Sequence, residues 1–147
     1  MTTTIDIASL IPHQGAMCLL ERVVSWDDER IRCAASNHRD PQHPLRGASG
    51  LLAACGIEYA AQAIAVHGSL TAAHDKEFSP PKLGYLANAK DVAWSVDRLD
   101  EIEGELTIDA EKLISEGGRS IYEFVISAQD RMLVQGRVAV VLEGATT

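Results

Sequence analysis

The sequence places one carboxylate in an unusual setting. Glu58 lies within residues 51–66, LLAACGIEYAAQAIAV, where nearly all other residues are apolar or small. A carboxylate in such a stretch is costly unless it is paired or functional. Burial favours its protonated form, which suits a general acid or a proton shuttle near neutral pH. Gln62, one helical turn later, would share its face and could orient it. The alternative is a structural role, in which Glu58 only accepts hydrogen bonds from a backbone donor or an arginine.

Two histidines are candidates for a base that would act with Glu58. His43 lies in an irregular loop, 15 residues before Glu58, and His38 is its rival in the same loop. An ordinary histidine can accept a proton at physiological pH, although many loop histidines are simply exposed. His67, nine residues after Glu58, would point to the opposite side of the helix, and His13 more plausibly has a structural role.

The sequence lacks the other common catalytic motifs. It contains no G-x-S-x-G elbow, no Walker loop and no G-x-G-x-x-G. No H-E-x-x-H or similar spacing of metal ligands occurs, so we predict neither a metal nor a cofactor.

The start of the predicted helix adds a third element. Backbone N–H groups near residues 52–54 would be free at the helix N-terminus and could polarise a thioester carbonyl. A base, an acid and such donors are what the elimination of water from a 3-hydroxyacyl thioester requires. The base takes the proton beside the carbonyl, the donors hold the developing oxyanion, and the acid protonates the departing hydroxyl.

Composition narrows the class of protein. The chain has 147 residues, of which 46% are hydrophobic and 23% charged, which suits one globular domain. Its net charge of −8 argues against nucleic-acid binding. Residues 51–66 are too short and too polar to span a membrane. Three widely spaced cysteines suit buried free thiols in a reducing cytoplasm. An acidic carrier protein would need a local basic patch, for which Arg30, Arg32, Arg39 and Arg46 are candidates.

The pattern of the elements predicts an α+β fold. Residues Leu51–Val66 are predicted to form one long helix, apolar nearly all round and therefore buried, with Gly68 near its C-terminal end. The predicted strands surround it in sequence and form an antiparallel sheet of about five to six strands that must wrap the helix. They are Met17–Trp26, Arg30–Ser36, Gly84–Val96, Glu105–Lys112, Ser120–Ala128 and Met132–Leu142. Turns are predicted at residues 117–118 and 129–131.

Three stretches resemble the hotdog-fold 3-hydroxyacyl-acyl-carrier-protein dehydratases. Residues 11–23, IPHQGAMCLLERV, are similar to the family's opening LPHxxPxLLxDRV, and the loop HPL at 43–45 is similar to its HFP. Residues 56–63, GIEYAAQA, match its LxEAxAQA, and this Glu-x-x-x-Gln helix is the most specific part. The resemblance covers nearly the whole chain. The segments 56–68 and 84–87 resemble a divergent bacterial branch associated with aryl polyene pigment clusters.

This resemblance implies roles for individual residues. His43 would be the base and Glu58 the acid, contributed by different subunits, so that a dimer would be required. The amide of Ala53 and the side chain of Gln62 would bind the substrate, and Leu86 would line the acyl tunnel. The His-to-Glu spacing is 15 here and 14 in the family, and residues 52–54 replace its Pro-Gly-Val at the helix start.

The leading expectation is therefore a cytoplasmic dehydratase that acts on a thioester of acyl-carrier protein or coenzyme A, as a homodimer or as a heterodimer with another hotdog subunit. Two alternatives stay open. One is an acyl thioesterase of the same fold, in which Glu58 would activate water. The other is a non-catalytic subunit that stabilises a catalytic partner.

Overall fold

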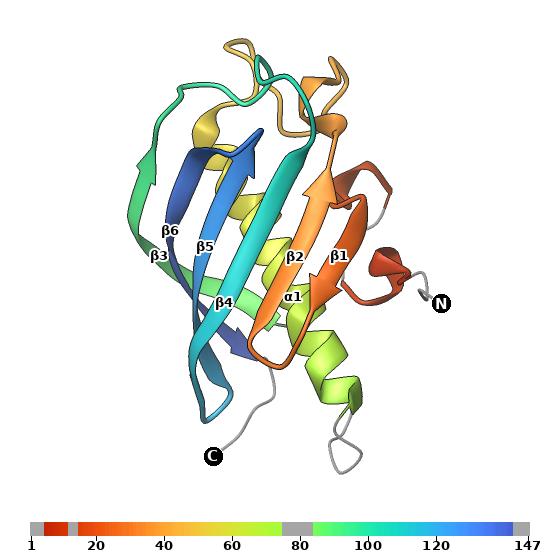
Figure 1. The fold of residues 1–147 in the computed structure, drawn as a ribbon, viewed down its shortest axis with the longest axis vertical. Coiled ribbons are helices and arrows are strands. Elements are labelled where there is room, and N and C mark those ends of the chain that lie inside the picture. Colours follow the sequence, from red (N-terminus) through yellow and green to blue (C-terminus); the bar gives the residue numbers. More distant parts are fainter. Residues whose placement is uncertain (1–4, 12–14, 75–83, 143–147) are drawn as a thin grey trace.

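Six strands and one long helix make up the described part of the chain. The computed structural model describes residues 5–11, 15–74 and 84–142. In chain order the elements are β1 (Arg22–Trp26), β2 (Arg30–Ala35), α1 (Gly56–His74), β3 (Gly84–Trp94), β4 (Leu106–Glu116), β5 (Arg119–Ala128) and β6 (Arg131–Leu142). Four short 3-10 turns precede or connect them: η1 (Ile7–Ser9), η2 (Gly15–Met17), η3 (Asn37–Arg39) and η4 (Ala53–Cys55). Figure 1 shows the sheet curving around α1.

All six strands belong to one antiparallel sheet, in the order β1-β2-β4-β5-β6-β3. The strand that follows the helix therefore does not pair with β2. It pairs with β6 and forms one edge of the sheet. The predicted α+β fold, an antiparallel sheet around one long helix, is confirmed.

Alternate residues in the first half of β4 are buried. Leu106, Ile108 and Ala110 are buried on the inner face, and neighbouring strands add further apolar side chains to the same cluster. The helix approaches this face closely at its start. A Cβ atom on Gly56 would lie 2.9 Å from Ile126 Cδ1 and 3.2 Å from Val134 Cγ2, so a larger residue would force these side chains to shift. Glycine at this position lets the helix and the sheet meet in contact.

The helix bounds differ from the prediction of Leu51–Val66. The α-helix begins at Gly56, after the turn η4, and it continues through Gly68 to His74. Its start is delayed because the Ala53 N–H donates to Asp97 O at 2.9 Å, and Leu52 is extended and forms a bridge with Arg98. These contacts with a distant segment outweigh the helical propensity of the sequence. No helix among the described residues is long and apolar enough to cross a bilayer.

The first strand also starts later than predicted. Residues before Arg22 form the turn η2 and an irregular segment, so the predicted strand Met17–Trp26 is correct only in its second half. The reason lies in the helix, because the backbone at Met17 and Leu19 bonds to the Gln62 side chain rather than to a neighbouring strand. The other strands and both predicted turns are confirmed within a few residues.

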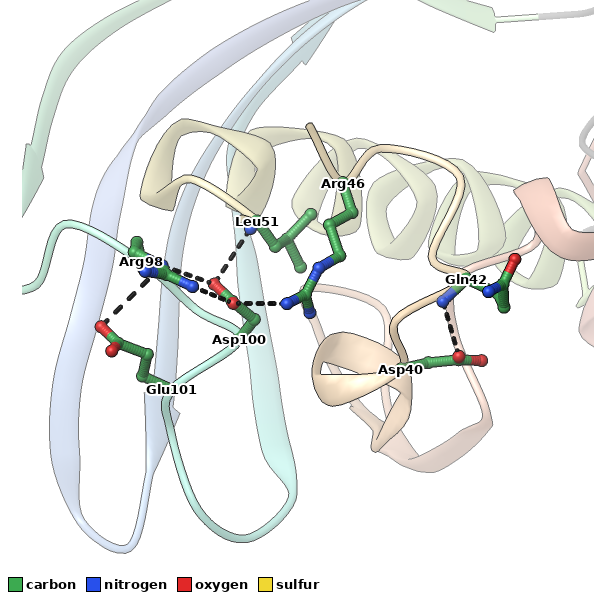
Figure 2. Close-up of polar contacts among 7 residues, drawn as sticks. All are labelled: Asp40, Gln42, Arg46, Leu51, Arg98, Asp100 and Glu101. Atoms are coloured by element: carbon green, nitrogen blue, oxygen red, sulfur yellow. Dashed lines mark hydrogen bonds and ion pairs between the residues drawn. The ribbon is translucent and has the colours of Figure 1, made fainter. Parts of the chain in front are cut away.

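A nearly inaccessible carboxylate joins the loop before the helix to the β3–β4 connection (Figure 2). The side chain of Asp100 is only 2% exposed. Arg98 binds it through two nitrogens, Nε to Oδ1 at 3.1 Å and Nη2 to Oδ2 at 2.6 Å. Arg46 Nη2 lies 3.3 Å from Oδ2, and the Leu51 N–H donates to Oδ1 at 2.9 Å. We call these four residues the Asp100 cluster.

The pKa of Asp100 and the backbone conformation of Gly50 both reflect the close packing of this cluster. The Arg98 guanidinium, followed by the Leu51 N–H, holds the pKa of Asp100 well below its usual range. Gly50 has φ of +91° and carries the chain past the cluster. A Cβ atom there would lie 2.6 Å from Arg98 Nε, so only glycine fits.

We expect Asp100→Ala to lower the free energy of unfolding by about 3 kcal/mol, because it leaves two guanidinium groups and one buried N–H without their acceptor. The melting temperature should fall by on the order of 10 °C. Urea denaturation and calorimetry would measure both.

Glu101→Ala is the matched control. Its side chain is 67% exposed and lies 3.9 Å from Arg98. An exposed pair of this kind contributes less than about 1 kcal/mol. Equal destabilisation by the two substitutions would contradict a special role for Asp100.

Candidate functional site

Gln62 anchors the helix to the segment that precedes β1. Its side chain is fully buried, and Oε1 accepts a hydrogen bond from the Leu19 N–H at 2.8 Å. Its Nε2 donates to Met17 O at 2.8 Å. The amide thus satisfies a backbone donor and a backbone acceptor at once, which fixes its orientation.

The same amide reaches Glu58. Gln62 Nε2 lies 3.3 Å from Glu58 Oε1, one helical turn away. Glu58 is half-buried rather than enclosed, and it belongs to the first turn of α1, where a carboxylate interacts favourably with the helix dipole. The predicted contact between Gln62 and Glu58 is confirmed. Both polar atoms of the Gln62 amide are bonded within the chain. The predicted binding of substrate by Gln62 stays a prediction.

His43 is buried and takes part in a different network. Its side chain contacts Tyr59, the residue after Glu58, with Nε2 2.9 Å from the Tyr59 hydroxyl. The Leu45 N–H donates to His43 Nδ1 at 3.1 Å, and the Tyr59 hydroxyl donates to Asn37 Oδ1 at 2.7 Å. The hydrogen bonds of His43 therefore go to Tyr59 and Leu45 rather than to Glu58. Its predicted role as a base stays a prediction.

His38 is more deeply buried, with 1% of its surface exposed. Because a carbonyl only accepts, Nε2 must carry the proton that is donated to Ile102 O at 2.9 Å. Nδ1 then carries a lone pair, and it has no hydrogen-bond partner among the described residues. His38 is thus the rival base by chemistry, but it is shielded from solvent in the isolated chain.

Two further predicted site residues have different outcomes. The prediction of a free Ala53 amide is wrong, because this N–H donates to Asp97 O, as described above. Leu86 lies on β3, and its backbone pairs with Val140. Its side chain is outside the part of the structure that is described, as is His13, so the predicted tunnel position stays a prediction.

The predicted arginine patch is largely neutralised. Arg30 pairs with Glu111 at 2.9 Å and Arg32 with Asp109 at 2.7 Å, both on the outer face of the sheet. They line a groove of about 750 Å³ that runs across this face. Neither Glu58 nor His43 lines that groove, so it is separate from the candidate site.

Sequence reasoning missed Tyr59 and its partner Asn37. A signal existed, since Tyr59 is the one large polar ring among the small residues of the helix, where the resembled pattern has alanine. Its hydroxyl is fully enclosed, and burial raises the pKa of Tyr59 above its usual range. Tyr59 therefore acts here as a neutral hydrogen-bonding group.

The curved antiparallel sheet around a single helix, with Glu58 and Gln62 on that helix, is the architecture of a hotdog-fold protein. The chain belongs to the ApeP-like family, described as ApeP dehydratases, whose model matches residues 5–145. A sequence search of the curated proteins finds no match.

Solved structures agree with this family. The chain is similar to the dehydratase heterocomplex ApeI:P from Xenorhabdus doucetiae, with a TM-score of 0.84 and 25% identity over 95% of this chain and 92% of that chain. A thioesterase from Haemophilus influenzae, HI1161, shares the fold with a TM-score of 0.61 and 10% identity over 86% and 80% of the two chains. A hypothetical thioesterase with coenzyme A from Streptococcus pneumoniae shares the fold with a TM-score of 0.56 and 12% identity over 86% of this chain and 88% of that chain.

We expect Gln62→Ala to lower the free energy of unfolding by about 2 kcal/mol, because it leaves the Leu19 N–H and the Met17 carbonyl without partners. Ser69→Ala, which removes a single hydrogen bond to Leu10 O, is the milder control. Urea denaturation would measure both. A change of less than about 0.5 kcal/mol for Gln62→Ala would contradict the anchoring role.

Stability should also fall as the pH decreases below about 6.5. Burial lowers the pKa of His38, His43 and His67 in the folded chain. His67 lies outside the site, between Tyr122 and the Asp27 carbonyl. Between the lowered values and 6.5 the unfolded chain binds more protons, so acid favours unfolding, by up to about 1.4 kcal/mol per pH unit for each histidine. Denaturant titrations at pH 7.5, 6.5 and 5.5 would show this, and a flat profile would contradict it.

Proposed function

We propose that this chain is a subunit of a dehydratase that removes water from a 3-hydroxyacyl thioester to give a 2-enoyl thioester. The single observation that carries the proposal is Glu58, oriented by Gln62 on the central helix of a chain that belongs to a dehydratase family. The thioester is attached to acyl-carrier protein, the reaction takes place in the cytoplasm, and the product enters fatty-acid or polyene synthesis, with aryl polyenes as the favoured case.

In this reaction Glu58 is the acid. A base removes the proton from the carbon beside the thioester carbonyl, and the electrons of that bond form the new double bond. The C–O bond to the 3-hydroxyl breaks as Glu58 gives it a proton, and water leaves. Glu58 is suited to this role because it is half-buried and lies in the first turn of α1.

A second hotdog subunit completes the protein. β3 is an edge strand of 11 residues, and Trp94 at its end is 50% exposed. Leu52, just before η4, is 48% exposed. A long edge strand and exposed apolar side chains each favour contact with another chain. The similarity to a chain of a dehydratase heterocomplex supports a heterodimer over a homodimer.

The test is to incubate the purified chain, alone and together with a second hotdog subunit, with a 3-hydroxyacyl-carrier substrate. Mass spectrometry should show loss of water, and Glu58→Gln should reduce its rate by about 10²-fold or more. Glu101→Ala, an exposed carboxylate away from the helix, is the control. Release of free acid would instead support a thioesterase, which the shared fold keeps as the second candidate. If the Glu58→Gln variant removes water at an unchanged rate, Glu58 is not the acid.

A further inference from the structure

The protonation state of His43 follows from its two neighbours. The Leu45 N–H donates to Nδ1 at 3.1 Å, so Nδ1 carries no proton in this arrangement. A neutral imidazole has one N–H, which must then be on Nε2. Nε2–H donates to the Tyr59 hydroxyl at 2.9 Å, and that hydroxyl donates onward to Asn37 Oδ1 at 2.7 Å. In this series of three hydrogen bonds each N–H or O–H donates to an acceptor, so the assignment of protons to His43 is consistent.

This state leaves His43 without a lone pair for a substrate. The one basic nitrogen already accepts a backbone N–H, and Nε2 is a donor. The ring is 4% exposed, and the Tyr59 ring lies with its centroid 6.0 Å away. To act as a base, His43 would have to break a hydrogen bond and leave a buried group unpaired.

The same contacts connect two segments. Asn37 lies at the start of the segment between β2 and η4 and His43 near its middle, and Tyr59 lies on α1, directly after Glu58. The Tyr59 hydroxyl donates to Asn37 and accepts from the His43 imidazole, so both loop residues are bonded to the helix next to the proposed acid. These bonds position the turn that carries Glu58.

We propose that His43 is a positioning residue that fastens this loop to Tyr59 and that it is not the base. The proposal rests on the dehydratase function proposed above and deepens it. The base that acts with Glu58 comes from the partner subunit, as the resemblance implies, and this chain supplies no base to the site in which His43 would meet the partner's acid.

The groups around His43 fit this role. Asp40, Arg46 and His38 are the charged or titratable neighbours that influence it. Arg46 is engaged by Asp100, and the Asp40 carboxylate accepts a hydrogen bond from the Gln42 N–H. None of these contacts supplies a carboxylate or carbonyl acceptor for Nδ1–H, which an imidazole needs if Nε2 is to present a lone pair.

Two substitutions separate positioning from base chemistry. His43→Asn keeps an oxygen that can accept the Leu45 N–H, as asparagine commonly does two residues ahead. His43→Gln keeps an amide that can donate to Tyr59. Neither side chain is a base near neutral pH. In the assembled pair, we expect both to dehydrate within about threefold of the wild type, whereas His43→Ala, which keeps neither bond, melts at a lower temperature than both.

A base role gives a different result. Removing a general base costs about 10²–10⁴-fold in rate. If His43→Asn and His43→Gln both lose 10²-fold or more while their melting temperature and pairing are unchanged, His43 is the base and the proposal is overturned. His38→Asn in the same series tests whether the buried rival, rather than the partner, supplies the base. A 10²-fold loss there, with unchanged stability, would overturn the partner assignment.

A second measurement does not depend on activity. Nitrogen-15 NMR of the imidazole in the full chain should show Nδ1 unprotonated and Nε2 protonated at pH 7, with any titration centred below the usual value of about 6.5. A proton on Nδ1, or titration near 6.5, would overturn the proposal. If the wild-type pair removes no water, the proposed function fails, while the NMR result and the melting temperatures still decide the role of His43.

Discussion

The structure depends most on one carboxylate. Asp100 is almost inaccessible, yet it is charged, because Arg98, Arg46 and the Leu51 N–H surround it. A buried charge is tolerated only when its partners are fixed, so Asp100 holds together parts that are far apart in sequence. Arg46 belongs to the loop of His43, and Leu51 leads directly into the helix of Glu58. The β3–β4 connection therefore determines where the loop and the helix begin relative to each other.

Much of the fold could be predicted from the sequence because its signals are local. The alternation in β4, the turns at residues 117–118 and 129–131, and the apolar helix are each determined by neighbouring residues. The start of the helix could not be predicted in the same way. Residues 51–55 have helical propensity, but the Leu51 and Ala53 N–H groups bond to Asp100 and Asp97, more than 40 residues later. A local pattern contains no information about such partners.

In the candidate site too, some contacts follow from local spacing and others depend on distant segments. The contact between Glu58 and Gln62 follows from helical periodicity alone, so spacing was sufficient to predict it. The state of His43 depends instead on the path of the loop, which brings the Leu45 N–H onto Nδ1, and on Tyr59, which meets Nε2. Residue type shows that a histidine can be a base, but only the geometry of its neighbours shows which nitrogen has a lone pair.

Glu58 and His43 differ in how deeply each is buried. Glu58 is half-buried, and Gln62 Nε2 lies 3.3 Å from its Oε1. His43 is enclosed, with two bonds of 2.9 and 3.1 Å and a further bond from Tyr59 to Asn37 behind them. Coupled bonds in a buried setting reinforce one another. Such an enclosed and fully hydrogen-bonded environment suits a group that holds a loop in place. On this argument a chain with a half-buried carboxylate and an enclosed histidine is suited to act as half of a pair.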